Sequence, residues 1–232
     1  MLTDGAAALF ARTALDTVGA AHFPEALGAA DVAALLHILA DLPPDRAGSR
    51  LHGIPALSAF LASDGPIGRI ASECLGRPGM AVRAILLDKS AATNWALGWY
   101  QDRTICVRQR IAVPGFGPWT VKAGLLHVAP PSALLERMVT LRIHLDPVDA
   151  DNAPLLIAPG SHAMGRIAEA DVAAAVDRCG TVTCRARAGD IWAYATPILH
   201  ASEAARRPRR RRVLQVDFSA DPLPGGLQWL GV

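Results

Sequence analysis

GDIWAYATPILHAS, residues 189–202, carries the clearest structural signal in this sequence. It begins with a Gly-Asp turn signal and continues as a strand-like run that ends near His200. The next strand-like run, RRVLQVDF, occupies residues 211–218 and begins at Arg211. If the two runs are neighbouring antiparallel strands, Arg211 lies close to the strand of His200 inside the same barrel.

The same pattern of short strand-like runs extends over the chain from residue 80 onward. Alternating or β-branched runs are separated by turn signals such as Pro114-Gly115 and Pro159-Gly160. We expect strands within residues 80–90, 104–113, 138–148, 153–162, 182–195 and 211–220. Before residue 80 the spacing of apolar residues instead predicts helices over residues 31–42, 54–63 and 66–76.

Helices first and antiparallel-type strands afterwards predict one mainly β domain, a β-barrel or jelly roll with helices against one face. Residues 1–79 would form a mainly helical buttress and residues 80–232 the β core. A helical insert is expected near residues 166–178. The sequence shows no internal repeat and no second composition, and no oligomeric state follows from it.

Composition narrows the function classes. Of the 232 residues, 51% are hydrophobic and 19% are charged, so a sizeable core is expected and disorder is not. The formal net charge of +2 argues against nucleic-acid or membrane binding by the whole protein. The basic run RRPRRRR, residues 206–212, lies in an expected hairpin connection and is interpreted as a solvated turn.

Cellular location is also indicated by the sequence. Cys74, Cys106, Cys179 and Cys184 form no CxxC pair, which favours a reduced, cytoplasmic setting. The N-terminal residues lack the basic region of a signal peptide. Apolar runs stay below the roughly 18 residues that a membrane span requires.

Candidate site residues come from two parts of the β region. Arg211 and Ser202 suit a small dicarboxylate, because a guanidinium grips a carboxylate in bidentate fashion and a hydroxyl adds a hydrogen bond. Asp102 lies in GWYQDRT, residues 98–104, and could hold a divalent metal together with His200. Two histidines and one carboxylate form the ligand set of non-haem Fe(II) oxygenases.

From about Ile85 to Leu223 the chain resembles the phytanoyl-CoA dioxygenase family of Fe(II)- and 2-oxoglutarate-dependent oxygenases. The similar segments, which follow the order of the family, are NWALGWYQDRT, FGPWTVKAGLLHVAPP, LLERMVTLRIHLD, NAPLLIAPGSH, GDIWAYATPILHAS and RRVLQVDF. Any one of these segments is a weak signal, whereas the ordered set is specific, and it is closest to a bacterial branch of the family.

The resemblance implies a double-stranded β-helix and an enzyme. Asp102 and His200 would be iron ligands, and Arg211 with Ser202 would bind 2-oxoglutarate. Gln101 would reach the cosubstrate or the substrate. The implied reaction uses O₂ and 2-oxoglutarate to hydroxylate a small organic molecule.

Tyr100 departs from the family pattern, which has the first histidine ligand at this position. Three interpretations remain open. Tyr100 could bind iron as a tyrosinate, although free tyrosine titrates near pH 10. Alternatively, Tyr100 is not a ligand and the iron site is weaker, or His127 or His144 replaces the missing histidine. In the extreme case the site no longer performs the chemistry.

Five further residues are candidates for the substrate pocket: Trp119, Lys122, His127, Arg142 and His144. Trp119 could instead cap the core, and Arg142 could instead pair with Asp146 or Glu136. His127 is expected to line the pocket rather than to bind the metal. Two rival functions remain, a catalytically silent relative that binds a small molecule in the same pocket and a redox-neutral metal-dependent isomerase or lyase.

Overall fold

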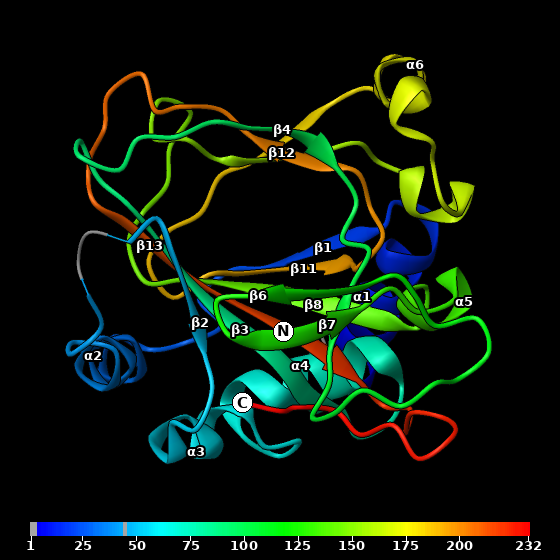
Figure 1. Ribbon diagram of the computed structural model, residues 1–232. Helices are drawn as coiled ribbons and strands as arrows, with labels where there is room; N and C mark the ends of the chain where they lie inside the picture. Colours follow the sequence, from blue (N-terminus) through cyan, green and yellow to red (C-terminus); the bar gives the residue numbers. More distant parts are fainter. Residues whose placement is uncertain (1–3, 44–45) are drawn as a thin grey trace.

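The computed structural model describes residues 4–43 and 46–232 and places a large and a small antiparallel sheet opposite each other (Figure 1). The large sheet has the order β1 (Ala20–Phe23), β11 (Ile191–Ala195), β8 (Met138–His144), β13 (Arg211–Ser219), β3 (Met80–Lys89) and β2 (Gly48–Leu51). The small sheet has the order β10 (Val182–Cys184), β9 (Leu155–Ile157), β12 (His200–Ser202) and β4 (Leu97–Tyr100). Two facing sheets with these strand orders form a double-stranded β-helix, so the predicted jelly roll is confirmed.

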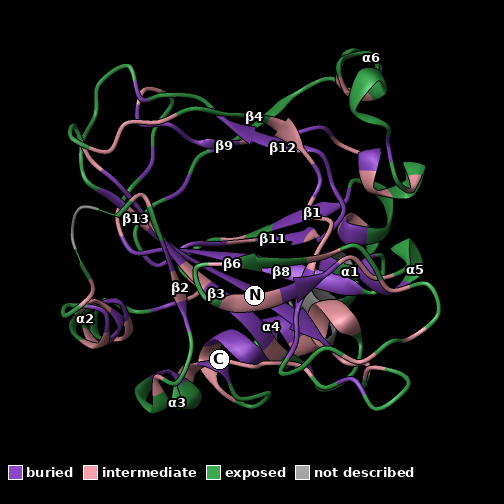
Figure 2. Ribbon diagram, viewed as in Figure 1, coloured by how far each residue is buried: buried purple, intermediate pink, exposed green. Residues whose placement is uncertain are grey.

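Shorter elements surround this barrel. A third sheet has the order β5 (Ile105–Cys106), β7 (Leu125–Val128) and β6 (Trp119–Lys122). Within the described ranges the α-helices are α1 (Asp4–Thr17), α2 (Ala29–Ile38), α3 (Ser58–Leu61), α4 (Pro66–Leu75), α5 (Ser132–Leu135) and α6 (Val172–Cys179). The 3₁₀ turns are η1 (Pro55–Leu57), η2 (Ser161–Met164) and η3 (Glu169–Asp171). In Figure 2 the strands of the two facing sheets are mostly buried, whereas α6 is exposed at the periphery.

The central strands β8 and β13 of the large sheet each have one mainly apolar face and one mainly polar face. On β13, Leu214, Val216 and Phe218 belong to the main hydrophobic core. Because side chains alternate along a strand, Arg211, Gln215 and Asp217 point to the opposite face, into the barrel. The same alternation on β8 separates Leu141 and Ile143 from Thr140, Arg142 and His144.

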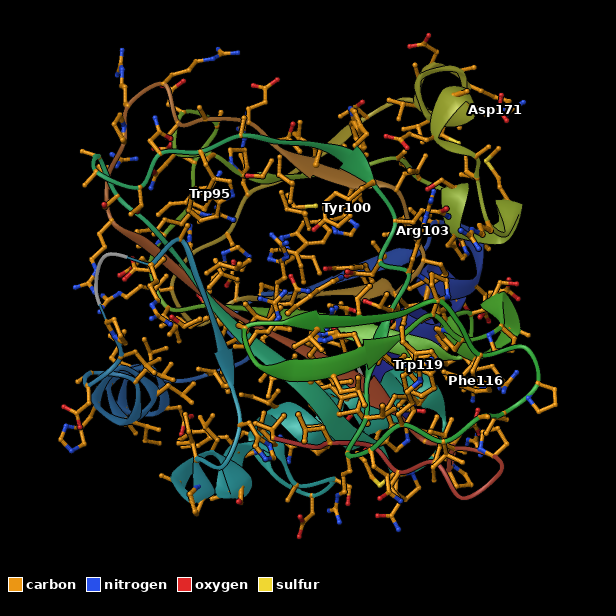
Figure 3. All side chains as sticks on the ribbon, in the orientation of Figure 1. Trp95, Tyr100, Arg103, Phe116, Trp119 and Asp171 are labelled. Carbon is orange, nitrogen blue, oxygen red and sulfur yellow. The ribbon has the colours of Figure 1, made fainter. Side chains whose placement is uncertain are left out.

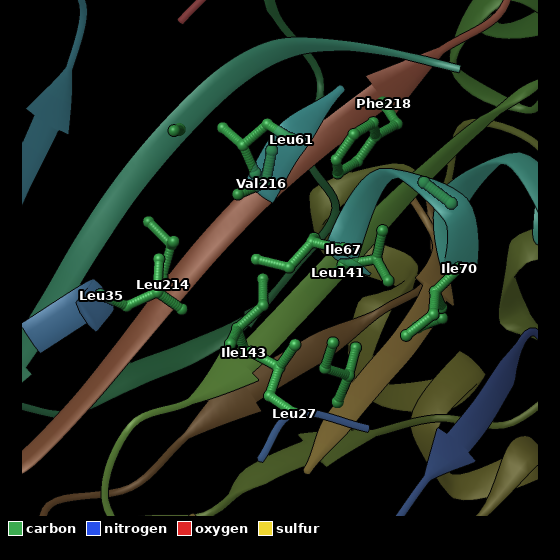
Figure 4. Packing of buried hydrophobic residues seen from close by; sticks show 14 of the residues in the cluster. Leu27, Leu35, Leu61, Ile67, Ile70, Leu141, Ile143, Leu214, Val216 and Phe218 are labelled. Carbon is green, nitrogen blue, oxygen red and sulfur yellow. The ribbon is translucent and has the colours of Figure 1, made fainter. Parts of the chain in front are cut away.

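The helices cover the apolar face of the large sheet. Figure 4 shows Leu35 of α2 and Ile67 and Ile70 of α4 packed with Leu141 and Leu214 of the sheet. Helix α4 begins with Pro66, whose fixed φ suits the first helical turn, and ends at Gly76 in the left-handed conformation. The helical layer leaves the polar face of the sheet to line the interior of the barrel.

The N-terminal part is less purely helical than the sequence analysis predicted. β1 and β2 fall between its helices and form the two edges of the large sheet. The helix expected over residues 54–63 is present as η1 followed directly by α3, and it ends at Leu61 because Ala62 adopts extended backbone angles. The helices expected over 31–42 and 66–76 are present as α2 and α4.

The β region also differs from the prediction in places. The strand expected over residues 104–113 is reduced to β5, and the residues that follow form loop. The run over 182–195 is two strands, β10 and β11, which belong to different sheets. The helical insert is present as η3 and α6. In the described part of the chain, helices long and apolar enough to cross a membrane are absent.

Candidate functional site

Tyr100 and His200 lie opposite each other in the small sheet. β4 and β12 pair antiparallel with Tyr100 in register with His200, and the ring centroids are 4.2 Å apart. Figure 3 shows Tyr100 among the side chains that fill the space between the two sheets. Burial raises the pKa of the Tyr100 phenol well above its ordinary value, and Asp102 raises it further, so the phenol stays protonated.

His200 presents one free nitrogen to the interior of the barrel. Nδ1 lies 2.9 Å from the Ile198 carbonyl oxygen, which can only accept, so we assign the ring proton to Nδ1. Nε2 is buried and has no hydrogen-bond partner within the described ranges. Burial lowers the pKa of His200, which favours the neutral imidazole with an available lone pair on Nε2.

Asp102 is held by a buried arginine that the sequence analysis did not identify. Arg83 Nη2 lies 3.3 Å from Asp102 Oδ1, and Arg83 Nε donates to Asp217 Oδ2 at 2.5 Å. Asp102 Oδ2 is buried without a hydrogen-bond partner in the described part of the chain. Burial tends to raise the pKa of Asp102, but Arg83 and then His200 lower it below its ordinary value. Asp102 is therefore an ionised carboxylate with one oxygen already paired.

Arg211 is the most deeply buried cation of the barrel. Its side chain is 1% exposed, and its Nε and Nη2 have no hydrogen-bond partner among residues 4–43 and 46–232. Burial, together with nearby Arg142, lowers the pKa of Arg211 to about 9, which still leaves the guanidinium charged at neutral pH. A buried charge without a partner is costly, so this guanidinium is the clearest anion-binding group in the structure.

Lys89 adds a second cation beside Arg211 and was also missed from the sequence. It pairs in register with Arg211 across β3 and β13. Its Nζ donates to Ser202 Oγ at 3.0 Å and to the carbonyl oxygen of Trp95 at 2.8 Å. Burial, followed by Arg211 and Arg142, lowers the pKa of Lys89 to about 7. The only sequence signal for this residue is a lysine that ends an apolar strand-like run.

Arg142 and His144 lie on the polar face of β8, as expected for inward-facing residues. Arg142 Nη2 donates to Gln215 Oε1 at 3.0 Å and not to Asp146, which instead pairs with Arg212. Both ring nitrogens of His144 are buried without a hydrogen-bond partner in the described residues. Burial and the nearby Arg211 lower the pKa of His144 to about 3, so the ring is neutral.

The side chains of Gln101 and Ser202 already form hydrogen bonds within the protein, which was not expected from the sequence. Gln101 Nε2 donates to the carbonyl oxygens of Gly165 and Pro197, and its Oε1 accepts from the backbone N–H of Ile167. Both amide protons of Gln101 are therefore used within the protein. The hydroxyl of Ser202 donates to the Ala153 carbonyl oxygen while it accepts from Lys89.

Three expected pocket residues lie around the third sheet. His127 donates from Nδ1 to the Leu125 carbonyl oxygen, and its Nε2 lies 2.9 Å from Cys106 Sγ. Trp119 packs in a satellite hydrophobic cluster, and Figure 3 shows it beside Phe116 and away from Tyr100. Lys122 Nζ donates to Thr104 Oγ1 at 3.3 Å. For Trp119, the alternative of a core cap describes its surroundings better than a substrate contact.

These positions decide how well an iron ion would fit. The described residues contain no group of three His, Cys, Asp or Glu side chains arranged to hold a metal, so neither His127 nor His144 completes a set with Asp102 and His200. The available donor atoms are Asp102 Oδ2, His200 Nε2 and a protonated phenol. This donor set does not fit the two-histidine, one-carboxylate centre.

A cleft of about 220 Å³ opens beside Asp102. Its lining includes Asp102, Arg103, Glu136 and Arg166, with Pro131 and Pro197 as apolar members. None of the five pocket residues expected from the sequence belongs to this lining in the described structure. The cleft mixes charged and apolar groups, as small-molecule sites commonly do.

The fold recurs in solved structures of low sequence identity. The apo structure of EctD from S. alaskensis has a TM-score of 0.70 and 20% identity, over 100% of this chain and 84% of that chain. The epimerase SnoN from nogalamycin biosynthesis, described as non-haem and α-ketoglutarate dependent, has a TM-score of 0.66 and 18% identity, over 93% and 82%. HygX from Streptomyces hygroscopicus, with nickel and 2-oxoglutarate bound, has a TM-score of 0.61 and 17% identity, over 94% and 87%.

Sequence comparison identifies the family. None of the proteins with curated descriptions matches the chain. The profile of the family Phytanoyl-CoA dioxygenase (PhyH) matches residues 15–213, which is most of the chain. The protein thus belongs to the phytanoyl-CoA dioxygenase family.

Proposed function

We propose that this protein binds a small dicarboxylate of the 2-oxoglutarate type inside the barrel and is a catalytically silent relative of the family's oxygenases. One observation carries the binding proposal: the Arg211 guanidinium is buried at 1% exposure, with two nitrogens that have no partner in the described residues. A carboxylate is the natural partner, because it accepts two parallel hydrogen bonds from a guanidinium.

The surroundings of Arg211 support an anionic ligand. Lys89 is its register partner across β3 and β13, and Arg142 is close enough to lower the pKa of both cations. Of the similar structures, HygX was solved with 2-oxoglutarate bound. Gln101, whose amide protons are used by backbone carbonyl groups, is left outside this proposed binding set.

The possible metal-donor atoms around Tyr100 support the proposal that this protein is catalytically silent. Asp102 and His200 offer one free atom each, and Arg83 occupies the other oxygen of Asp102. A phenol held in the protonated state is a poor third ligand. We therefore assign no reaction step to a metal in this protein.

A second candidate is the oxygenase function itself, on a small organic molecule with O₂. It is favoured by the two buried, unpartnered atoms, Asp102 Oδ2 and His200 Nε2, which could hold Fe(II) without Tyr100. In that case the cleft beside Asp102 would receive the substrate.

Calorimetric titration with 2-oxoglutarate tests the binding proposal. Wild-type protein should bind, and Arg211→Met should weaken binding by about tenfold or more, as expected when hydrogen bonds to a charged group are lost. Arg206→Met, an exposed arginine in the same basic run, is the matched control and should bind like the wild type. Equal affinity of the Arg211→Met variant would contradict the proposal.

Succinate formation separates the two candidates. With Fe(II), 2-oxoglutarate and O₂, the silent relative should form no succinate above a protein-free control. Under anaerobic conditions it should also lack the visible charge-transfer band of 2-oxoglutarate chelated to Fe(II). Succinate formation that His200→Ala abolishes would establish the oxygenase instead.

A further inference from the structure

Arg83 lies between two carboxylates inside the barrel. It is 8% exposed and lies on the same face of β3 as Lys89. Nε donates to Asp217 at 2.5 Å, and Nη2 lies 3.3 Å from Asp102. Asp217 is fixed in turn by Thr140, whose hydroxyl donates to Oδ1 at 3.0 Å. Arg83 is therefore held by carboxylates from β13 and from the loop after β4, and Thr140 of β8 fixes one of them.

This contact involves the carboxylate that the family likeness assigns to a metal. One oxygen of Asp102 is already paired with a fixed positive charge. A metal bound to Oδ2 would lie close to that guanidinium. Two neighbouring cations repel each other strongly in a buried site. Arg83 shares its single charge between Asp102 and Asp217, and its presence disfavours a second cation directly beside it.

The balance of buried charges inside the barrel also favours an anionic ligand over a metal ion. The cationic side chains buried in its described interior are Arg83, Lys89, Arg142 and Arg211, and the facing carboxylates are Asp102 and Asp217. The buried acids Asp88 and Asp190 are paired elsewhere, with Arg210 and His22. Below pH 7, where Lys89 is protonated, four cations against two carboxylates leave an excess of two positive charges, which is the charge that one dicarboxylate neutralises.

We propose that Arg83 takes over the electrostatic role of the missing metal, so that the dicarboxylate binds to this protein without any metal ion. This inference rests on the proposed function, because it concerns the same ligand in the same barrel. A divalent ion would raise the excess charge of the interior and would compete with Arg83 for Asp102. In this chain, metal and ligand binding are therefore uncoupled.

The first test uses wild-type protein treated with a chelator. Calorimetric titration with 2-oxoglutarate should give the same affinity in chelator as with Mn(II) added. Binding that appears only with Mn(II) would overturn this inference and leave the dicarboxylate proposal intact. Absence of binding under both conditions would contradict the dicarboxylate proposal itself, so the two failures are distinguishable.

The second test changes Arg83. Arg83→Met should weaken 2-oxoglutarate binding in chelator by about tenfold or more. It should also strengthen binding of Mn(II) to the ligand-free protein, because both oxygens of Asp102 become available. Arg83→Lys keeps the charge and should retain metal-free binding. The surface variant Arg69→Met is the matched control and should resemble the wild type.

Loss of folding is a concern for Arg83→Met, because it leaves two buried carboxylates unpaired. The double variant Arg83→Met with Asp217→Asn removes one buried charge of each sign and keeps the net charge of the interior unchanged. It should show the same gain in Mn(II) affinity as Arg83→Met, because both oxygens of Asp102 are available in each variant. Unchanged 2-oxoglutarate affinity in chelator for folded Arg83→Met, or unchanged Mn(II) affinity for the double variant, would overturn the role of Arg83.

Discussion

Tyr100 and His200 face each other across the pairing of β4 and β12, with ring centroids 4.2 Å apart and planes inclined by 56°. A phenol thus packs against His200 at the position where the family resemblance leads us to expect a histidine ligand. Because burial keeps this phenol protonated, the contact is a packing contact between two aromatic rings. The relation between these two residues separates this chain from a three-ligand iron centre.

Restoring the histidine is the most direct test of that relation. Tyr100→His should raise the affinity for Co(II) or Fe(II) by at least about tenfold, since even groups that only orient a ligand contribute 10- to 100-fold. Metal titration of the ligand-free protein measures the effect. Tyr100→Phe removes the hydroxyl without adding a donor and should leave metal affinity unchanged. An equal affinity for Tyr100→His and wild type would mean that Asp102 and His200 do not converge on one point.

Lys89 predicts a pH dependence of ligand binding. Its pKa is lowered to about 7 in the ligand-free protein, first by burial and then by Arg211 and Arg142. Only the protonated ammonium attracts a dianion, so the affinity for 2-oxoglutarate should be full below pH 7 and should fall as the pH rises above it. Lys89→Arg stays charged over this range and should bind with a flat pH profile. A flat profile for the wild type would show that Lys89 does not contribute to binding.

The lowered pKa of Lys89 also affects the stability of the ligand-free protein. This stability should change with pH in the opposite direction to the affinity for 2-oxoglutarate. Between about pH 7 and the ordinary lysine value of 10.5, the unfolded chain holds the Lys89 proton and the folded chain has released it. Stability therefore rises with pH in this window by the contribution of Lys89. Urea unfolding of wild type and Lys89→Met between pH 7 and 9, below the pKa of Arg211, should show a rise that is larger in the wild type by the contribution of Lys89.

The two faces of the large sheet should respond differently to mutation. Leu214→Ala on β13 opens a cavity in the core against the helices and should cost about 2–5 kcal/mol of unfolding free energy. The folded fraction should bind 2-oxoglutarate normally, because Leu214 points away from the barrel. Leu97→Ala removes an exposed leucine and should change stability little. A loss of affinity in folded Leu214→Ala would contradict the assignment of the two faces.

The strand pattern was predictable because period-two alternation appears in the sequence itself. The strands β3, β8 and β13 each combine apolar and polar positions, and Arg211 begins its strand as expected. β1 and β2 are four residues long and lie between helices, so no periodicity could reveal them. Their strand geometry depends on pairing with β11 and β3, which are remote in the sequence.

The residues of the candidate site were also only partly predictable from the sequence. The family resemblance predicted that Tyr100, Asp102 and His200 lie together, and the structure pairs Tyr100 with His200. Arg83 and Lys89 were not, because their importance comes from partners more than 100 residues away, Asp217 and Ser202. A charged residue inside a strand-like run does not reveal whether it faces solvent or the interior of a barrel.

Gln101 provides the last prediction, which tests whether it contacts the cosubstrate or holds the loops together. Its amide donates to the carbonyl oxygens of Gly165 and Pro197 and accepts from the N–H of Ile167. Gln101→Ala would leave three backbone groups without their partner, at about 1–3 kcal/mol for each buried group that water cannot reach. Urea unfolding should therefore show a loss of at least about 2 kcal/mol, whereas the exposed Gln109→Ala should show none. If Gln101→Ala instead weakens 2-oxoglutarate binding and leaves stability unchanged, Gln101 is a cosubstrate contact, as the family resemblance first implied.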